Sequence, residues 1–526
     1  MSITGESLQA VVCLFRISPE SLFLELNEAS DLQSKNFVTK FMEEPINTPF
    51  TNTEDRISKL PDDMILQIFS FLDMKQVVQT SVLARRWKSI WISLLILSFD
   101  LNLFKSTLTG CTDPDAFTAF VNWILMVRHS NSGIQRFHLK LKTLDCSRYF
   151  DLTGRINTWI FGCLQSNVQE LSFDVGLLAY QSYKFPLCLF NSKSLTKLVL
   201  KLGCMLAVEI VLPDTMDLPM LKYLKLCGLS IYQENLNAKL FLSCPVLESL
   251  NITRCNVNLN DVCVAPKLKY FKLKYNDYNV DGGDTISLHA PCLKSFICKN
   301  YMFREYNVKN LASLVTADIT MMVEDEEDNS FSELSDLDKE FCTASMIRLL
   351  ESLHCVRDLA LSYWFLEAVS EDPQLLVDEL SDHFGNLQNL KLQTFLSEES
   401  ICAITQLLNI STNIESLKVI IVKDFVPNPL MYRSIDEIMF DPKADDWEQV
   451  LLLLYHLKFV MIVGVQCRIN GLKFLKMLFK KAVALEKVFL YYDSVSPIVA
   501  EAFSRKLMTF PIASSSISFK WWLVTS

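Results

Sequence analysis

The sequence has few residues that break regular structure, and it lacks the short patterns that mark common catalytic sites. Its 526 residues include only 13 glycines and 17 prolines, and 50% of them are hydrophobic. This composition excludes a collagen-like, low-complexity or globally disordered chain. The sequence contains no HExxH, Gly-x-Ser-x-Gly, P-loop or GxGxxG pattern, and its six histidines are scattered. We therefore expect no metal, no cofactor and no catalytic activity.

Long hydrophobic runs and an excess of basic residues are also missing. The longest apolar run, from Val450 to Val465, is interrupted by His456 and Lys458, whereas a membrane-spanning helix needs about 20 apolar residues. The N-terminal residues carry an acid but no base before a short apolar run, which fits poorly with a signal peptide. The net charge of −10 argues against a chain that coats nucleic acid. We expect neither a membrane nor a nucleic acid as a partner.

Paired cysteine motifs are absent as well. The 16 cysteines form no CxxC pair and no Cys/His cluster at zinc spacing. Several of them stand beside aliphatic residues, where a free cysteine behaves as a small core residue. We interpret them as reduced thiols, and we expect a soluble protein of the cytoplasm, the nucleus or both.

One stretch near the N-terminus is rich in helix signals. Pro61 presets the backbone angle of a first helical turn, and the two acids after it suit the positive end of the helix dipole. Apolar residues then recur on one helical face as far as Leu72. Asp73 can cap a second helix, and a third is predicted over about residues 81–91. Because three short helices bury little surface of their own, we expect this unit to contact a second protein.

The residues of this stretch resemble the F-box of plant proteins. The resemblance rests on Asp55-Arg56-Ile57-Ser58, on Leu60-Pro61 and on Arg85-Arg86-Trp87, and it covers about residues 54–100. It implies docking onto a Skp-family adaptor, and through it onto a cullin and a RING protein. The residues that would face the adaptor or support that face are Leu60, Pro61, Ile65, Ile68, Leu72, Leu83, Trp87 and Trp91. The alternative is a small helical subdomain whose aromatic residues pack inward on the rest of the chain.

A short template, apolar-x-x-apolar-x-apolar, recurs thirteen times between Ile134 and Leu490. From Leu195 to Leu314 its copies begin 21 to 26 residues apart, which is the period of leucine-rich repeats. In that architecture each repeat adds one short strand to a curved parallel sheet, and neighbouring repeats bury a common core. The pattern therefore predicts an α/β solenoid. An ordinary α/β protein with many short strands is the alternative.

Two intervals break the repeat. The first contains the acidic run 324–328, and we predict an exposed acidic loop over residues 324–340. The second is rich in proline and opens the C-terminal part of the chain. There, Leu472 to Leu478 and Leu485-Glu486-Lys487 resemble the FBD domain that follows the F-box and leucine-rich repeats in many plant proteins. This part reads as strand, amphipathic helix, strand, and would close the open end of the solenoid.

Together these patterns predict an α/β chain that resembles the plant F-box/FBD/leucine-rich-repeat family. The predicted parts are a poorly ordered extension (1–53), a three-helix F-box (54–100), a curved leucine-rich-repeat solenoid with a parallel sheet (101–413), an FBD-like region that completes it (414–507) and a C-terminal tail (508–526).

Lysines gather at particular positions of the template. Side chains at its fifth and seventh positions should point to the open, concave face of the sheet, because side chains alternate along a strand. Those positions carry acids only at Asp174 and Asp318. The lysines there are Lys140, Lys201, Lys225, Lys272, Lys274, Lys299, Lys391 and Lys418. We hypothesise that they bind an acidic or phosphorylated segment of a target protein. The alternative is that lysine is simply a common solvent-facing residue.

The expected function is that of a non-catalytic substrate adaptor of an SCF-type (Skp-cullin-F-box) ubiquitin ligase. The F-box would hold the ligase and the repeats would hold a target, whose lysines would then be concentrated near the ubiquitin-loaded enzyme. Two alternatives remain open. One is a protein that binds the adaptor without promoting degradation, and the other is a repeat scaffold in which the helices only cap the solenoid.

Overall fold

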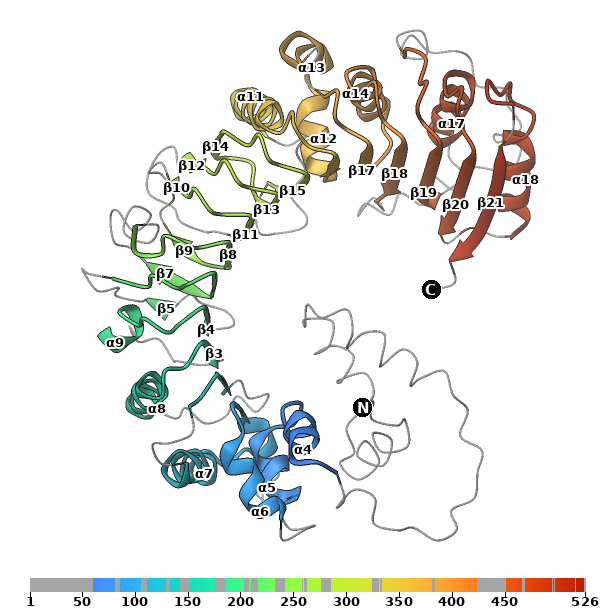
Figure 1. Ribbon diagram of the computed structural model, residues 1–526. Helices are drawn as coiled ribbons and strands as arrows, with labels where there is room; N and C mark the ends of the chain where they lie inside the picture. The colour runs from blue at the N-terminus through green and yellow to red at the C-terminus, as the bar shows by residue number, and fades with distance from the viewer. Residues whose placement is uncertain are drawn as a thin grey trace, which may run out of the picture. The chain divides into compact units, whose positions relative to one another are not determined.

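The computed structural model divides the chain into two compact units (Figure 1). The first contains residues 1–179 and 186–199, and the second contains residues 180–185 and 200–526. The described residues are 60–80, 86–105, 111–128, 133–141, 152–175, 185–202, 208–209, 216–231, 242–257, 259, 263–275, 285–323, 331, 334–380, 384–422, 451–465, 469–493, 495, 497–515 and 517–524. The predicted extension 1–53 and Leu83 lie outside them.

The first unit opens with the short helices that the sequence predicts. They are α4 (Asp62–Phe69), α5 (Met74–Thr80), α6 (Trp87–Ile90) and the 3₁₀ turn η1 (Trp91–Ser93). Helix α4 begins directly after Pro61, whose backbone oxygen accepts hydrogen bonds from the amides of Met64 and Ile65 at 3.1 Å each. It ends three residues before Leu72, the predicted end.

Strands and helices alternate through the rest of the first unit. The elements are β1 (Ile96–Asp100), η2 (Leu101–Leu103), α7 (Pro114–Val127), β2 (Arg136–Lys140), α8 (Thr153–Gln165), β3 (Glu170–Val175) and α9 (Leu187–Phe190), and β4 (Lys197–Leu202) lies at the boundary between the units. Strands β1, β2 and β3 pair in parallel, so that Leu97, Phe137 and Leu171 lie side by side. Strand β1 also carries the repeat template, at Leu94, Leu97 and Phe99, although it falls within the range predicted for the F-box, 54–100.

The second unit is built on eleven described strands that pair in parallel in chain order. They are β6 (Tyr223–Cys227), β8 (Ser249–Thr253), β11 (Tyr270–Lys274), β13 (Ser295–Tyr301), β15 (Thr316–Met322), β16 (Asp358–Leu361), β17 (Asn389–Thr394), β18 (Ser416–Ile421), β19 (Phe459–Val465), β20 (Lys487–Asp493) and β21 (Ser518–Val524). Every one of the thirteen template copies coincides with a strand, from β2 to β20. The predicted parallel sheet is therefore confirmed.

One side of this sheet is covered by other elements. Two small parallel sheets come first, made of β5 (Val208–Glu209), β7 (Leu229–Ile231) and β9 (Asn256–Val257), and of β10 (Cys263–Val264), β12 (Thr285–His289) and β14 (Glu305–Lys309). Helices follow in the same layer, with α11 beside β14 and α12 against β15. These helices are α11 (Asp336–Ser352), α12 (Tyr363–Ser370), α13 (Pro373–Leu380), α14 (Glu398–Asn409), α17 (Ile469–Lys481) and α18 (Pro497–Leu507).

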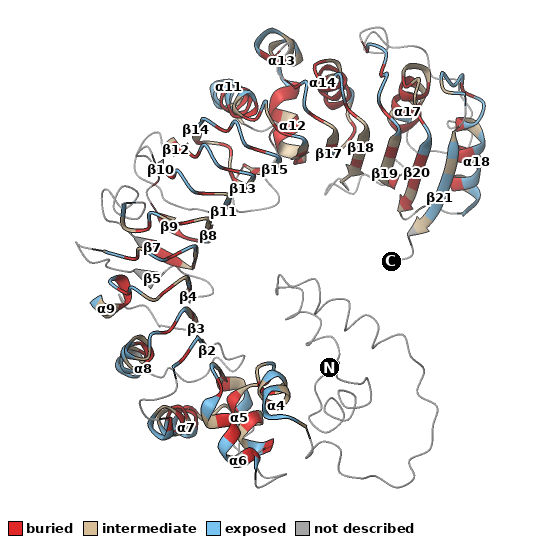
Figure 2. Cartoon of the chain, viewed as in Figure 1, coloured by how far each residue is buried: buried red, intermediate tan, exposed pale blue. Residues whose placement is uncertain are grey.

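The core lies between the sheet and this covering layer (Figure 2). Along β8, Leu250 and Ile252 are buried, whereas Ser249, Asn251 and Thr253 are partly exposed. The same alternation runs along most of the described strands of the large sheet. The third, fifth and seventh positions of each template copy therefore face solvent on the opposite side of the sheet, as the alternation of side chains requires.

Two segments differ from their predicted structure. The predicted acidic loop 324–340 extends too far, because α11 begins at Asp336, where the hydroxyl of Ser335 accepts a hydrogen bond from the amide of Asp338 at 3.2 Å. Residues 324–330 lie outside the described residues. The predicted tail 508–526 contains β21, which pairs with β20 and extends the sheet. None of the described helices is long and apolar enough to cross a membrane.

Candidate functional site

The F-box helices have a core of their own. Ile65, Leu72, Trp87 and Trp91 are each at most 4% exposed. The rings of Phe69 and Trp87 meet edge to face, with their centroids 5.7 Å apart. These four predicted site residues therefore lie inside the helical unit and not on its surface.

An apolar stripe remains on the outside of α4. Pro61, Met64, Ile68 and Phe71 recur at intervals of three and four residues, so they follow one side of the helix and its last turn. Pro61 and Phe71 are exposed, with Phe71 at 42%, and Met64 and Ile68 are partly exposed. We call these four residues the α4 stripe. Leu60, directly before it, is also partly exposed, so the structure brings three predicted residues together at the surface.

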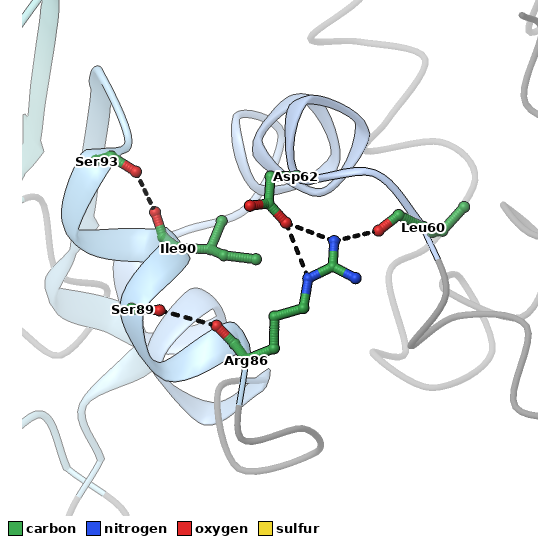
Figure 3. Close-up of polar contacts among 6 residues, drawn as sticks. All are labelled: Leu60, Asp62, Arg86, Ser89, Ile90 and Ser93. Carbon is green, nitrogen blue, oxygen red and sulfur yellow. Dashed lines mark hydrogen bonds and ion pairs between the residues drawn. The ribbon is translucent and has the colours of Figure 1, made fainter.

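Arg86 joins the two ends of the F-box (Figure 3). Its guanidinium donates from Nε to Oδ1 of Asp62 at 2.9 Å, and from Nη2 to the same carboxylate oxygen and to the backbone oxygen of Leu60. The start of α4 is thereby fastened to the start of α6. The hydroxyls of Ser89 and Ser93 donate to the backbone oxygens of Arg86 and Ile90, at 3.1 and 2.8 Å. The bonds of Arg86 thus hold the start of the α4 stripe against α6.

The F-box is also attached to the first repeats. Arg128, at the C-terminal end of α7, is 4% exposed, and its Nη1 donates to the backbone oxygens of Trp91 and Ile92 at 3.2 and 2.6 Å. The ring of Trp91 packs on that of Trp123 with the centroids 5.6 Å apart. The α4 stripe is thus carried on a rigid base within the first unit.

The predicted concave lysines all lie on the exposed side of the sheet. None of the eight is buried, and each of them directly follows a buried residue in its strand. In the first unit, however, Lys140 forms an ion pair with Asp100 at 2.9 Å. Asp100 lies on β1, outside the thirteen template copies, so the count of acids on this face was too low. The sheet is less basic here than the sequence predicts.

Four of the lysines gather in the second unit, on β6, β11 and β13. The register pairs Lys274 with Lys299, and Lys272 lies between the positions of Asn251 and Ile297. Partial burial lowers the pKa of Lys272, and the charges of Lys274 and Lys225 lower it further, while Asp318 opposes them. The ammonium of Lys299 lies 5.0 Å from the ring centroid of Tyr275. The cluster is a local concentration of positive charge.

Lys391 and Lys418 lie side by side on β17 and β18. They stand next to a group of aromatic side chains on the same face of β19, β20 and β21, which the sequence reading missed. The signal for it was present, because β19 is apolar at successive positions on both of its faces. Such a strand is expected to be covered on both sides or to form a binding surface.

The described residues also bear on metal binding and on thiol chemistry. Within it, no three His, Cys, Asp or Glu side chains lie close enough together to hold a metal ion. Burial raises the pKa of Cys244, Cys255 and Cys342 to about 12, so these thiols are protonated at neutral pH and are poor nucleophiles. The exposed features are apolar and basic surfaces, which suit protein binding.

Comparisons with known proteins match two regions of the chain. A family model of the F-box domain matches residues 57–99. A second model, which describes the LRR repeats of FBD-associated F-box protein At5g56370, matches residues 156–321. The matched regions contain the α4 stripe and the lysine cluster on β6, β11 and β13.

Three relatives come from Arabidopsis thaliana. F-box/FBD/LRR-repeat protein At4g26340 is 30% identical over 363 residues, which are 66% of this chain and 80% of the relative. F-box/FBD/LRR-repeat protein At5g22700 is 27% identical over 320 residues, 59% of this chain and 68% of the relative. F-box protein At3g59000 is 31% identical over 280 residues, 52% of this chain and 54% of the relative. The chain therefore belongs to the plant F-box/FBD/leucine-rich-repeat family.

Proposed function

We propose that this protein is a substrate-recognition adaptor of an SCF-type ubiquitin ligase. F-box and leucine-rich-repeat proteins generally act in this way, and they are typically not enzymes themselves. The α4 stripe would bind a Skp-family adaptor, which links it to a cullin and a RING protein. The exposed face of the sheet would bind the target, with its lysines contacting acidic or phosphorylated groups.

The α4 stripe is the observation that carries this proposal. An exposed apolar row on a short helix, beside a buried core that keeps it rigid, has the composition of a helix-mediated protein interface. The bonds of Arg86 to Asp62 and Leu60 hold the start of this helix in place. Leu60, Pro61 and Ile68 from the predicted set would contact the adaptor, and Ile65, Leu72, Trp87 and Trp91 would support them from within.

A substitution on the stripe tests the proposal. We expect Ile68→Glu to weaken binding of a Skp-family adaptor by tenfold or more, because it places a charge at the centre of an apolar interface. Its matched control is Gln67→Glu, which adds the same charge at the exposed neighbouring position on the same helix. The measurement is a calorimetric titration of the purified full chain with the adaptor.

Three results would count against the proposal. It is wrong if neither the wild type nor a Leu60→Ala/Pro61→Ala variant binds any Skp-family adaptor. If Ile68→Glu and Gln67→Glu weaken adaptor binding equally, the α4 stripe is not part of the interface. If adaptor and cullin assemble on the chain but the reconstituted ligase transfers no ubiquitin to a bound target, the protein binds the adaptor without promoting degradation.

The cellular location belongs to the same proposal. The buried cysteines Cys163, Cys244, Cys255, Cys298 and Cys342 are free thiols. Free thiols persist in reducing compartments. We propose that the protein resides in the cytoplasm, the nucleus or both, and imaging of the tagged full chain checks this.

A further inference from the structure

The exposed face of the sheet has a different character over β17 to β21. Strand pairing aligns side chains into rows across these five strands, and the rows on the exposed face begin at Asn389, Lys391 and Gln393. Their fifteen residues include four lysines and four aromatic residues but no acid, and none of the fifteen is buried. We call this surface the Lys-aromatic face.

Aromatic rings form the centre of this face. Phe489 contacts Phe459 and Trp522 edge to face, with centroids 5.3 and 5.5 Å apart. Trp522 also stacks on Tyr491, at 5.0 Å and an interplanar angle of 15°. Trp522 remains 41% exposed. The rings hold one another in place, so they offer a rigid apolar platform at low entropic cost to a ligand.

Lysines flank the platform on two sides. The middle row reads Lys391, Lys418, Met461, Phe489 and Lys520 across successive strands. Within the described part of the chain, none of these lysines takes part in an ion pair. An apolar centre between two groups of uncompensated positive charge is complementary to an apolar residue between negative charges.

We propose that the Lys-aromatic face binds an extended segment of a target protein in which acidic residues flank one aromatic or aliphatic residue. Lys418 and Lys520 lie three strands apart, roughly 14 Å at about 4.8 Å per strand. An extended chain covers this distance with about four residues at roughly 3.3 Å each. The acids of the segment should therefore stand about four positions apart, with the apolar residue between them on the platform.

The other lysine cluster of the second unit fits this ligand less well. Asp318 occupies the same row as Lys225 and Lys272, and it reduces the positive charge there. Beside that cluster, Tyr275 is already in contact with the cations of Lys299 and Arg254. The exposed Tyr270 makes no ring contact within the described residues that would hold it in a platform. The Lys-aromatic face combines an accessible aromatic platform with unopposed lysines, so we place the contact with the target there.

A peptide selection tests this inference, which rests on the proposed role as a target-binding adaptor. The probe is a random library of peptides of about a dozen residues, selected on the purified full chain, and adaptor binding is measured separately. We expect enrichment of peptides with two acids about four positions apart around an apolar residue. The most enriched peptide is then titrated by fluorescence anisotropy. Its affinity should fall as the salt concentration rises, because lysines provide part of the attraction.

Matched variants locate the site. We expect Trp522→Ala and Lys418→Glu each to weaken binding of the peptide about tenfold or more. The control for the first is Trp521→Ala, because Trp521 is 37% exposed, lies on the same strand and contacts Tyr492 on the covered side of the sheet. The control for the second is Lys309→Glu, at an exposed end of β14. Both controls should change the affinity less than about twofold. Circular dichroism checks that all four variants are folded.

The possible failures can be told apart. The inference is overturned if the enriched peptides lack acids, or if Trp522→Ala and Lys418→Glu leave the affinity unchanged. In either case adaptor binding would still support the proposed function. Residues 423–450 carry seven acids and three bases. If the peptide binds only after these residues are replaced by a Gly/Ser linker, the face is assigned to this segment of the chain itself and the inference is overturned. Peptide binding without adaptor binding would contradict the proposed function alone.

Discussion

Position 464 requires glycine, because neither the backbone conformation nor the space around it allows a side chain. It has a φ of +83°, and it lies at a register shift between Val463 and Val465 in β19. A Cβ atom at this position would lie 2.5 Å from the backbone oxygen of Ile421. The strand pairing that presents Val463 beside Tyr491 on the Lys-aromatic face therefore depends on a glycine here.

We expect Gly464→Ala to lower the free energy of unfolding by about 1–3 kcal/mol or more, since it combines an unfavourable φ with a backbone clash. Urea unfolding followed by circular dichroism measures the change. Gly471→Ala is the control, because a Cβ there meets Phe503 at an ordinary distance of 3.8 Å, and alanine is favoured over glycine in a helix by about 0.5–1 kcal/mol. Equal stability of the two variants would show that β19 tolerates a different register.

Helix α5 illustrates how a helix start is coupled to pH. Its cap is Asp73, whose Oδ1 accepts from the amide of Lys75 at 2.8 Å and whose own amide donates to Oε1 of Gln76 at 3.1 Å. These are the reciprocal bonds of a capping box. Burial raises the pKa of the Asp73 carboxyl to about 7, although backbone hydrogen bonds act in the opposite direction. Its Oδ2 is buried without a hydrogen-bond partner among the described residues.

This raised pKa predicts that stability falls with rising pH. The pKa of Asp73 is 3.8 without the fold and about 7 with it, so between these values the folded chain binds more protons than the unfolded chain. The contribution is complete below about pH 4 and is lost as the pH rises through about 7. Asp73→Asn keeps the cap oxygen and removes the charge. We expect it to be more stable than the wild type by about 1–3 kcal/mol at pH 8, and about equal at pH 4.

Thermal unfolding of both proteins across this pH range provides the measurement. Burial also raises the pKa of Glu367 to about 7, with help from Glu399 and Glu371, so the wild type alone cannot assign the effect. The difference between the two proteins isolates Asp73. A difference that stays constant from pH 4 to pH 8 would contradict a titrating cap.

At the scale of single elements, the sequence predicts strands better than it predicts the covering layer. The template locates every described strand of the large sheet from β2 to β20, because two of its apolar positions are always buried there. It locates none of the strands of the two small sheets. The sequence does not predict helix α11, because the buried face of this helix includes Thr343 and Ser345. Their hydroxyls donate to the backbone oxygens of Ala368 and Arg304 at 2.8 and 2.7 Å. Polar residues that are satisfied by distant partners cannot be read as core from the sequence alone.

The candidate surfaces were predictable to different degrees. The motif gives one list of residues, in which the exposed Pro61 and the partly exposed Leu60 and Ile68 stand beside residues that are buried beneath them. A sequence pattern does not distinguish a residue that contacts a partner from one that supports the contact. Phe71 was missed for the same reason, since it stands beside the buried Leu72. The aromatic platform depends on the pairing of β19 with β20 and of β20 with β21, whose partner residues are 27 to 31 residues apart along the chain. No local pattern reveals this pairing.

At the scale of the whole molecule, the parallel repeats predict that damage to the core stays local. In the second unit each strand of the large sheet pairs only with its immediate neighbours, from β6 to β21. The stability of such an array is the sum of the stabilities of its repeats and of the interfaces between adjacent repeats. A lost core side chain should therefore weaken the adjacent repeats most, while distant repeats keep their protection.

Phe296 and Phe474 provide a matched pair, because both are fully buried and lie at different places in the array. Phe296 stacks on Phe271 across β13 and β11 with centroids 5.7 Å apart, and Phe474 lies in α17 between β19 and β20 in the chain. Each substitution by alanine should cost about 3–5 kcal/mol locally. By hydrogen exchange, we expect Phe296→Ala to accelerate the amides of β11, β13 and β15 and to spare those of β19 and β20, with the reverse pattern for Phe474→Ala. If both variants accelerated all of these strands alike, the second unit would unfold as one cooperative body, and binding at the Lys-aromatic face would then depend on every repeat of that unit.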